Sequence, residues 1–514
     1  MTTTEPEAPA EPVRVGSFET VIPRPVRATS AAGRFVITPA TVLAVAPGSD
    51  ADGAAALLRD ELAPALGTPL EVTGADGGDD RVADVGAGVA IAFERSVDPS
   101  LGREGYDLEV TPQRVTVRAR SAEGFGWAVQ TLLQALPADV ASAQPVHGSL
   151  ALPAGTVHDL PRYGWRGAML DLARHWFGPD DVEAVIDLMA RYKLSILHLH
   201  LSDDQGWRIQ IRAYPALTEV GSATEVGGGE GGFLTQDDYR RLVAHAARRG
   251  ITVVPEIDMP GHTNAALVSL PWLNCDGKAP EPYTGTQVGF SSLCTDRPTT
   301  TEFIDTVVGE LAELTPGPYV HLGGDESHAT TPEAYGAFVA EAADIVRSHG
   351  KIPVGWEEAG TVDIGSNAVV QHWLDPAKAA AGADRGAGVV LSPAPVAYID
   401  MKVLADMEVG NSWAGIIGTR TAYEWDPATR VPGIRPDRIL GVEAPLWSET
   451  FSTRAQMGRL LLPRLPGYAE LGWSGGPSPG GFTEYATRLA AQAPRWDAWG
   501  WTWTADPDVS WPHP

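Results

Sequence analysis

Two acidic residues, Asp325 and Glu326, stand next to each other in the stretch HLGGDESH, residues 321–328. Two carboxyl groups in one site can carry out general acid and base chemistry, as in many sugar-cleaving enzymes. Neighbouring side chains on a regular strand point to opposite faces, so this pair needs an irregular backbone to act together. Gly323 and Gly324 precede the acids, and residues without a Cβ permit a bulge or twist. The stretch therefore predicts a strand end at which both carboxylates reach the same mouth.

Three tryptophans, Trp356, Trp373 and Trp447, end three other short apolar runs. Indole rings stack on the flat C–H faces of sugars, and an apolar box holds a small group such as an acetyl methyl. A single tryptophan at a strand end is more often a packing residue. Three tryptophans at the ends of different runs favour a role in forming the wall of a sugar-binding site.

The stretch ILHLHLSDD places His198 and His200 on the same face of a strand, and Asp203 follows His200 by three residues. Such a pattern can bind a metal ion, as in metal-dependent amide hydrolases, or it can form a hydrogen-bonded network. His262, in PEIDMPGH, is expected between Asp203 and Glu326, where it would handle charge or a proton.

The elements that position these residues follow a repeating pattern from about residue 160. Eight short apolar runs alternate with helical stretches, which predicts a (β/α)8 TIM barrel. An open doubly wound sheet is the competing architecture, but no glycine-rich dinucleotide fingerprint follows the first run. The expected strands are 166–173, 196–203, 252–259, 319–326, 352–358, 368–373, 388–394 and 439–447.

Most of these runs finish in polar or aromatic residues. Barrel strands carry catalysis at their carboxyl ends, so the endings predict one functional rim. They are Asp171 with Arg174, Asp203, Asp258, Asp325 with Glu326, Trp356 with Glu357, Trp373, and Trp447 with Glu449, while Tyr398 and Asp400 follow the seventh run.

The 514 residues are too many for one ordinary core and indicate two domains. Residues 1–15, rich in Thr, Glu, Pro and Ala, are predicted to be a disordered tail. Residues 16–158 read as a small α+β domain, with helices at 52–66 and 124–136 and a hairpin at 106–120. Residues 159–514 are assigned to the barrel.

The net charge of −27 argues against nucleic acid and anionic membranes as partners. The sequence contains no run of about 18 apolar residues, so no membrane-spanning helix is predicted. The first residues lack the features of a signal peptide, so the expected location is cytoplasmic, with an exported mature form left open. Cys275 and Cys294 are either a disulfide or two reduced thiols.

Several stretches together resemble glycoside hydrolase family 20, the β-N-acetylhexosaminidases. They occur in family order between about 163 and 475, and the small α+β domain in front also fits. They are RGAMLDLARHWF, LHLHLSDDQGWRI, VVPEIDMPGHTNAAL, HLGGDESH, VGW, QHW, AYIDMK and GVEAPLWSE.

The resemblance implies a retaining enzyme in which the 2-acetamido oxygen of the sugar attacks its own C1, with no metal or cofactor. Glu326 would be the general acid/base, and Asp325 would orient the acetamide N–H. The remaining roles would be a hydrogen bond to the acetamide oxygen from Tyr398, pocket walls from Trp356, Trp373 and Trp447, hydroxyl binding by Arg174, Asp400 and Glu449, and tuning of Glu326 by Asp203 and His262.

The expected substrate is a terminal GlcNAc or GalNAc of a β-linked glycan or chitooligosaccharide, with sugar preference, linkage and oligomeric state left open. Two alternatives stand beside this reading. One is a metal-dependent hydrolase using His198, His200 and Asp203. The other is a non-catalytic carbohydrate-binding barrel.

Overall fold

The computed structural model describes residues 12–74, 90–476 and 479–512. The chain divides into two compact units, which are residues 1–161, 483–501 and 510–514 (unit 1), and residues 162–482 and 502–509 (unit 2). Most of the predicted tail lies outside the described residues. Its last part, Val13–Val15, differs from the prediction and forms strand β1, because it pairs with residues 149–151 of a longer strand.

Unit 1 is built on a mixed β-sheet with the strand order β1-β8-β6-β7-β5-β3-β4, in which β2 pairs with β8. Helices α1 (Asp52–Leu66) and α2 (Ala122–Ala135) match the two predicted helices, and β6 and β7 form the predicted antiparallel hairpin. The remaining bounds are β2 Arg27–Ile37, β3 Val42–Val45, β4 Glu71–Gly74, β5 Ala90–Arg95, β6 Tyr106–Val110, β7 Arg114–Ala119 and β8 Ser149–Asp159.

Residues 483–501 belong to unit 1, although the sequence assigned everything after 159 to the barrel. They include most of α14 (Gly481–Ala490) and all of α15 (Ala493–Ala498). The guanidinium of Arg495 donates hydrogen bonds to the carbonyl oxygens of Leu133, Gln134 and Leu136, at the end of α2. Those carbonyls lack partners within their own helix, so a cation from the distant segment satisfies them and ties it to unit 1.

Unit 2 contains a closed barrel in which, among the described residues, eight parallel strands pair in chain order and β16 closes on β9. The predicted TIM barrel is therefore confirmed. Every residue of β9 is buried, as expected for a parallel strand covered on both faces. The strands are β9 Trp165–Asp171, β10 Ile196–His200, β11 Thr252–Glu256, β12 Tyr319–His321, β13 Ile352–Trp356, β14 Val369–His372, β15 Gly388–Leu391 and β16 Ile439–Leu446.

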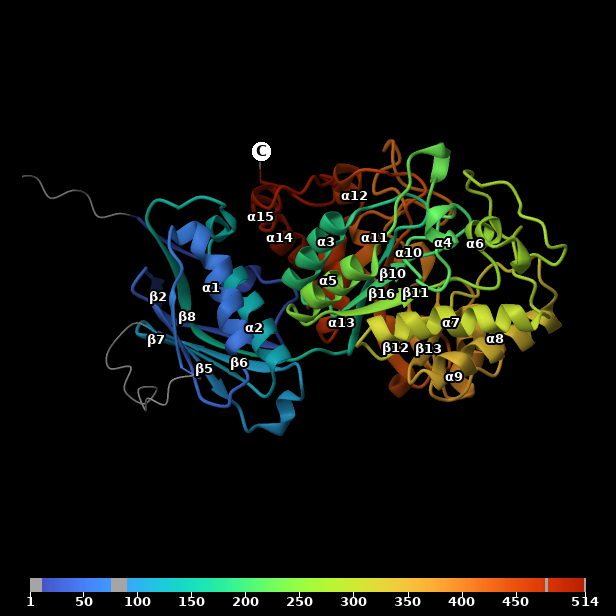
Figure 1. Ribbon diagram of the computed structural model, residues 1–514. Coiled ribbons are helices and arrows are strands. Elements are labelled where there is room, and N and C mark those ends of the chain that lie inside the picture. The colour runs from blue at the N-terminus through green and yellow to red at the C-terminus, as the bar shows by residue number, and fades with distance from the viewer. Residues whose placement is uncertain (1–11, 75–89, 477–478, 513–514) are drawn as a thin grey trace, which may run out of the picture. The chain divides into compact units, whose positions relative to one another are not determined.

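Helices surround these strands (Figure 1). The helix α5 (Gln236–Ala247) begins with a capping box, since the Thr235 hydroxyl accepts from N of Asp238 and the Asp238 carboxylate accepts from N of Thr235. The other helices of unit 2 are α3 Pro179–Arg191, α4 Ala216–Glu219, α6 Asn264–Ser269, α7 Pro298–Leu314, α8 Pro332–Ser348, α9 Pro376–Asp384, α10 Ala394–Ala397, α11 Thr419–Tyr423, α12 Arg454–Leu461 and α13 Leu465–Trp473.

The barrel interior changes character along its axis. An apolar cluster draws one residue from each of six strands, namely Trp165, Ile196, Val254, Val354, Val369 and Val390. The carboxyl ends of the strands instead carry buried charged groups. This division leaves the polar end free for chemistry.

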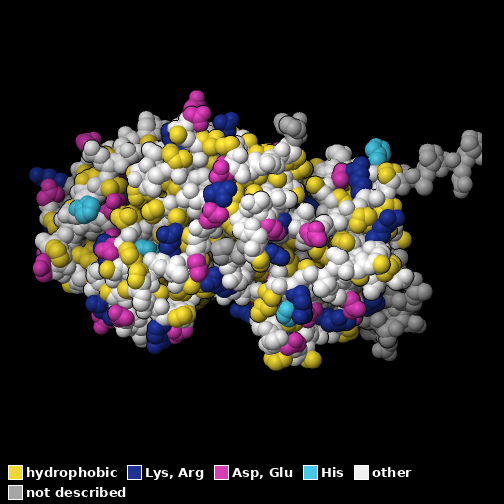
Figure 2. Space-filling model, turned by 180° about the vertical axis from the view of Figure 1, so that it is seen from behind, with side chains coloured by type: hydrophobic (Ala, Val, Ile, Leu, Met, Phe, Trp, Pro, Cys, Tyr) yellow, Lys and Arg dark blue, Asp and Glu magenta, His cyan; other side chains and the backbone are white. Residues whose placement is uncertain are grey.

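The surface carries both signs of charge despite the acidic composition. Figure 2 shows Lys and Arg side chains interspersed with Asp and Glu side chains over one face. No helix in the described part of the chain has both the length and the apolar character required to span a bilayer.

Candidate active site

A cavity of about 480 Å³ opens at the carboxyl end of the barrel, within the usual size of a small-molecule site. Its lining residues come from several strand ends and loops. They are Arg174, Thr286, Val288, Asp325, Glu326, Trp373, Leu374, Tyr398, Asn411, Trp413, Trp447, Glu449 and Thr450. A larger cavity, of about 900 Å³, lies in unit 1, and its lining includes none of the predicted site residues.

The backbone after β12 turns so that the two adjacent acids reach one cavity. Gly323 and Gly324 have φ of +65° and +97°, and Glu326 itself has φ of +45°, all in the left-handed region. A Cβ on Gly323 would lie 1.8 Å from Oδ1 of Asp258, so only glycine fits there. Oδ1 of Asp258 also accepts a hydrogen bond from N of Gly324 at 2.9 Å, which holds the turn. Asp325 and Glu326 consequently line the same cavity, as the glycine pair predicts.

His262 connects the two acids to the charged groups behind them. Its Nε2 lies 3.6 Å from Oε2 of Glu326 and 3.8 Å from Oδ2 of Asp325. Its Nδ1 lies 3.3 Å from Oδ1 of Asp203, whose Oδ2 is 2.8 Å from Nη2 of Arg174. The predicted position of His262, between Asp203 and Glu326, is therefore confirmed.

The charge states follow from this arrangement. Burial alone would raise the pKa of Asp203, but the charges of Arg174 and His262 lower it well below its usual range. Burial opposes charging of His262, yet the neighbouring Asp203 and Asp325 carboxylates raise its pKa well above that of free imidazole. Burial raises the pKa of Asp325 to about 7, with His262 opposing and Glu326 adding to the rise.

Aromatic rings form one side of the cavity. Trp373 and Tyr398 lie nearly parallel, with ring centroids 6.4 Å apart and an interplanar angle of 17°. The ring centroid of Tyr398 also lies 6.4 Å from that of Trp447, at an interplanar angle of 50°. Trp356 is only 1% exposed, and its ring centroid lies 5.7 Å from that of Trp447. It is not among the residues that line the cavity, and it packs against Trp447, which is.

The groups predicted to hold sugar hydroxyls also divide into lining and supporting residues. Arg174 and Glu449 line the cavity, whereas Asp400 is fully buried. Nδ2 of Asn411 donates to Oδ2 of Asp400 at 3.2 Å and to Oε2 of Glu449 at 3.4 Å, and so joins the two carboxylates. Burial and the Glu449 carboxylate raise the pKa of Asp400 well above its usual value.

The histidines that suggested a metal site face carboxylates through every ring nitrogen. Nδ1 of His198 lies 2.8 Å from Oε1 of Glu443, and its Nε2 lies 3.0 Å from Oε2 of Glu256. Nδ1 of His200 lies 2.5 Å from Oε2 of Glu256, and its Nε2 lies 2.9 Å from Oδ2 of Asp203. These four contacts are hydrogen bonds of ordinary or short length, so the geometry favours the network reading of this stretch over a metal site.

Comparison with known proteins assigns the chain. The model of glycosyl hydrolase family 20, catalytic domain, matches residues 163–476, and the model of the family's domain 2 matches residues 19–160. The chain belongs to glycosyl hydrolase family 20. The resemblance in the motifs is therefore confirmed, and the family 20 chain is a glycoside hydrolase of the β-N-acetylhexosaminidase type.

Similar proteins cover nearly the whole family 20 chain. A β-N-acetylhexosaminidase from Cellulomonas fimi is 43% identical over 498 residues, which is 96% of this chain and 97% of that protein. The structure of the family 20 β-N-acetylhexosaminidase from Streptomyces coelicolor A3(2) has a TM-score of 0.92 at 44% identity and covers 97% of this chain and 100% of that one. The Streptomyces plicatus enzyme in complex with thio-NAglucal has a TM-score of 0.91 at 46% identity, covering 98% and 99%.

Some lining residues of the family 20 site were not found from the sequence. Asn411 and Trp413 follow the seventh strand in an irregular segment, and Trp413 is 56% exposed beside Tyr398 at 5.8 Å. Thr286 and Val288 come from the long loop between α6 and α7. None of them ends an apolar run, so the strand-end pattern had no means of selecting them.

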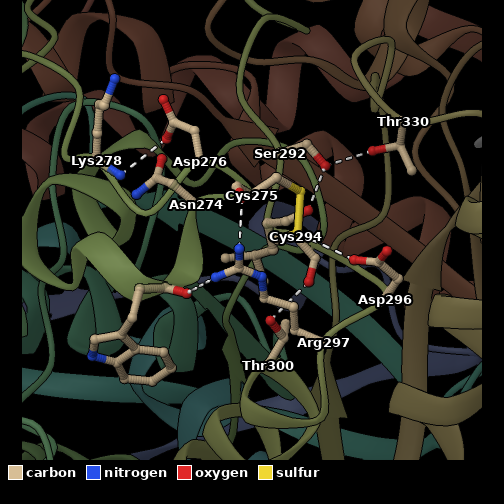
Figure 3. The surroundings of a disulfide bond; sticks show 12 residues. Asn274, Cys275, Asp276, Lys278, Ser292, Cys294, Asp296, Arg297, Thr300 and Thr330 are labelled. Carbon is tan, nitrogen blue, oxygen red and sulfur yellow. Dashed lines mark hydrogen bonds between the residues drawn. A yellow bond between two sulfur atoms is a disulfide. The ribbon is translucent and has the colours of Figure 1, made fainter.

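A disulfide between Cys275 and Cys294 closes the same loop. The sequence had left open whether these two cysteines are bonded or are reduced thiols. Arg297 donates hydrogen bonds to the carbonyl of Cys275 and to that of Trp272, and Thr300 donates to the carbonyl of Cys294 at 2.8 Å (Figure 3). The base of the loop is therefore held covalently and by hydrogen bonds, while its middle reaches the cavity.

Proposed function

We propose that this family 20 enzyme removes terminal β-linked GlcNAc or GalNAc from glycans or chitooligosaccharides with retention of configuration. The sugar's own 2-acetamido oxygen is the nucleophile. The observation that carries the proposal is the turn at Gly323 and Gly324, which presents Asp325 and Glu326 to one cavity beside an aromatic wall. The structures of the Streptomyces plicatus enzyme with thio-NAglucal and with GlcNAc support a 2-acetamido sugar as ligand.

In the first step the acetamide oxygen forms a bond to C1 while the C1–O bond to the leaving group breaks. Glu326 gives its proton to the departing oxygen, as a general acid. The product on the sugar is a cyclic oxazolinium, whose positive charge spreads over the acetamide. Asp325 accepts the acetamide N–H and stabilises that charge, and Tyr398 donates to the acetamide oxygen and aligns it. Because the nucleophile belongs to the substrate, its effective concentration is high.

In the second step Glu326, now ionised, takes a proton from water as the water attacks C1. The bond between C1 and the acetamide oxygen breaks, the acetamide re-forms, and Glu326 is protonated again. Two inversions at C1 retain the anomeric configuration. His262 and Asp203 tune Glu326 from behind, which is supported by the 3.6 Å and 3.3 Å separations along this path.

The remaining residues bind the sugar. Trp373 and Trp447 contact the acetamide group, with Trp356 supporting Trp447. Arg174 and Glu449 hold ring hydroxyls, and the fork of donors on Arg174 suits this role. Asp400, buried behind Asn411, acts on Glu449 through the amide that both carboxylates share.

The test is a panel of aryl 2-acetamido-2-deoxy-β-glycosides of the glucose and galactose series, beside the matching sugars that carry a 2-hydroxyl. Replacing the acetamide with hydroxyl should nearly abolish turnover. Efficient cleavage of plain β-glucosides, or a glycosyl ester on an Asp or Glu found by mass spectrometry, would contradict the mechanism. Assays with EDTA should equal those without it, since no proposed step uses a metal ion.

A further inference from the structure

The buried carboxylate of Glu256, at the end of β11, contacts side chains from three other strands of the barrel. Its Oε1 accepts a hydrogen bond from Nε1 of Trp356 at 2.8 Å and lies 3.1 Å from Nδ1 of His321. Its Oε2 lies 2.5 Å from Nδ1 of His200 and 3.0 Å from Nε2 of His198. Glu256 does not line the cavity, and the strand-end pattern did not select it.

Two of these partners pack against the same lining residue. Trp356 lies 5.7 Å from Trp447 between ring centroids, and His200 meets Trp447 edge-on at 4.9 Å. Glu256 therefore holds both rings that support Trp447 from inside the barrel. A shift of this carboxylate would move the wall that Trp447 forms.

The same carboxylate is also linked to the charged path behind Glu326. Nε2 of His200 lies 2.9 Å from Oδ2 of Asp203, and Asp203 contacts His262 on its other oxygen. One chain of contacts thus runs from Glu256 through His200 and Asp203 to His262. Each partner in it is almost completely buried, so water does not compete for these hydrogen bonds.

We infer that Glu256 is a positioning residue that couples the sugar-binding wall to the groups that handle the proton. Through Trp356 it sets the place of Trp447, and through His200 it sets the orientation of Asp203 and hence of His262. The inference rests on the proposed function of this site and adds a residue to it.

The charges agree with this geometry. Burial alone would raise the pKa of Glu256, but His200, His321 and His198 lower it well below its usual range. Burial opposes charging of His200, while Glu256 and Asp203 raise its pKa well above that of free imidazole. Glu256 and His200 are thus a charged pair, and such buried pairs depend strongly on their geometry.

Glu443, on β16, offers a matched control. It is equally buried, accepts a hydrogen bond from Nε1 of Trp165 at 2.8 Å, and lies 2.8 Å from Nδ1 of His198. The Glu443 carboxylate thus also pairs with an indole and an imidazole, but Trp165 belongs to the apolar end of the barrel. Glu443→Gln therefore reports the general effect of neutralising a buried carboxylate.

The experiment compares kcat and KM for an aryl 2-acetamido glycoside, and the inhibition constant of free GlcNAc, in three variants. Glu256→Gln keeps one oxygen for Trp356 but presents an amide to the histidines, so kcat should fall by about 10²-fold, the cost of a small misplacement. Trp356→Phe removes the indole N–H, so KM and the GlcNAc inhibition constant should rise more than kcat falls. Glu443→Gln should leave all three close to wild type.

The double variant of Glu256→Gln with Trp356→Phe should show non-additive changes in the GlcNAc inhibition constant, because the two side chains contact each other directly. Equal effects of Glu256→Gln and Glu443→Gln on kcat, or full additivity of the double variant, would overturn the inference. Should Glu256→Gln not fold, His200→Asn interrupts the same path, and wild-type kcat in that variant would overturn it too. The proposed function is judged separately, by whether the wild-type enzyme turns over the acetamido glycoside.

Discussion

The imidazole of His262 directs Nε2 toward the carboxylate of Glu326, 3.6 Å away. Its other nitrogen contacts Asp203, which is itself held by Arg174 at 2.8 Å. Glu326 is therefore the cavity end of a series of contacts that continues through the buried side chains of His262, Asp203 and Arg174. Nε2 of His262 also lies 3.8 Å from Oδ2 of Asp325, so one imidazole contacts both acids of the site.

Glu326→Gln removes the proton donor proposed for the leaving group. We expect kcat on an unactivated disaccharide to fall by roughly 10²–10⁴, the usual effect of losing a general acid. An aryl glycoside with a good leaving group needs less protonation, so it should lose less. Steady-state kinetics on both substrates measure the difference, and wild-type rates on the disaccharide would remove Glu326 from this role.

Asp325→Asn should strongly impair turnover of 2-acetamido substrates and yet stabilise the protein at alkaline pH. The folded protein raises the pKa of Asp325 to about 7, against about 3.9 in an unfolded chain. Between these values the folded state retains a proton that the unfolded state has lost, so stability falls as pH rises and the full cost is present above pH 7. At about 1.4 kcal/mol per pKa unit the cost is a few kcal/mol.

Thermal melts of wild type and Asp325→Asn at pH 4 and pH 8 check this. The variant should melt higher than wild type at pH 8, and the gap should shrink at pH 4, where Asp325 is protonated in the folded state and about half protonated in the unfolded chain. A gap that is independent of pH would show that the ionisation of Asp325 is not the cause.

Asp203→Asn should destabilise the protein by about 3–5 kcal/mol at neutral pH and lower kcat, because it leaves Arg174 and His262 without their buried anion. The folded state lowers the pKa of Asp203, so its contribution is present above the unfolded pKa of about 3.9 and is lost as pH falls. The stability difference should therefore change little between pH 7 and pH 4 and shrink only as pH falls below about 3.9.

The neighbouring Asp204→Asn is the matched control. Oδ1 of Asp204 accepts hydrogen bonds from N of Asn264 and the hydroxyl of Ser291, and an asparagine keeps that acceptor. Burial raises the pKa of Asp204, so a neutral amide suits its surroundings. If the two variants lost equal stability at pH 7, the ion pairs of Asp203 would not explain the effect.

Replacing Cys275 and Cys294 together by serine opens the loop that carries Thr286 and Val288 to the cavity. Closing a loop of this length contributes about 3 kcal/mol by chain entropy, so the melting temperature should fall. KM should rise while kcat changes little, since Asp325 and Glu326 lie outside the loop. Wild-type enzyme kept in a strong reductant should behave in the same way. An unchanged KM in both the serine variant and the reduced enzyme would show that the loop does not contribute to substrate binding.

The strand ends could be found from the sequence because parallel strands covered on both faces read as continuous apolar runs. Each run of unit 2 became a barrel strand, and polar residues of these runs, such as Asp171 and Asp203, came to the carboxyl end of the barrel. The glycine pair before Asp325 likewise indicated an irregular turn from local chemistry alone.

The tertiary structure alone decided which of these residues face the cavity and which support it from behind. Asp400 and Trp356 follow the strand-end pattern yet are buried, where Asp400 accepts a hydrogen bond from Asn411 and Trp356 packs against Trp447. Residues 483–501 joined unit 1 because Arg495 completes the end of α2, a contact that no local periodicity records. Periodicity reports which side of its own element a residue occupies, whereas contacts and proton affinities depend on neighbours that only folding brings together.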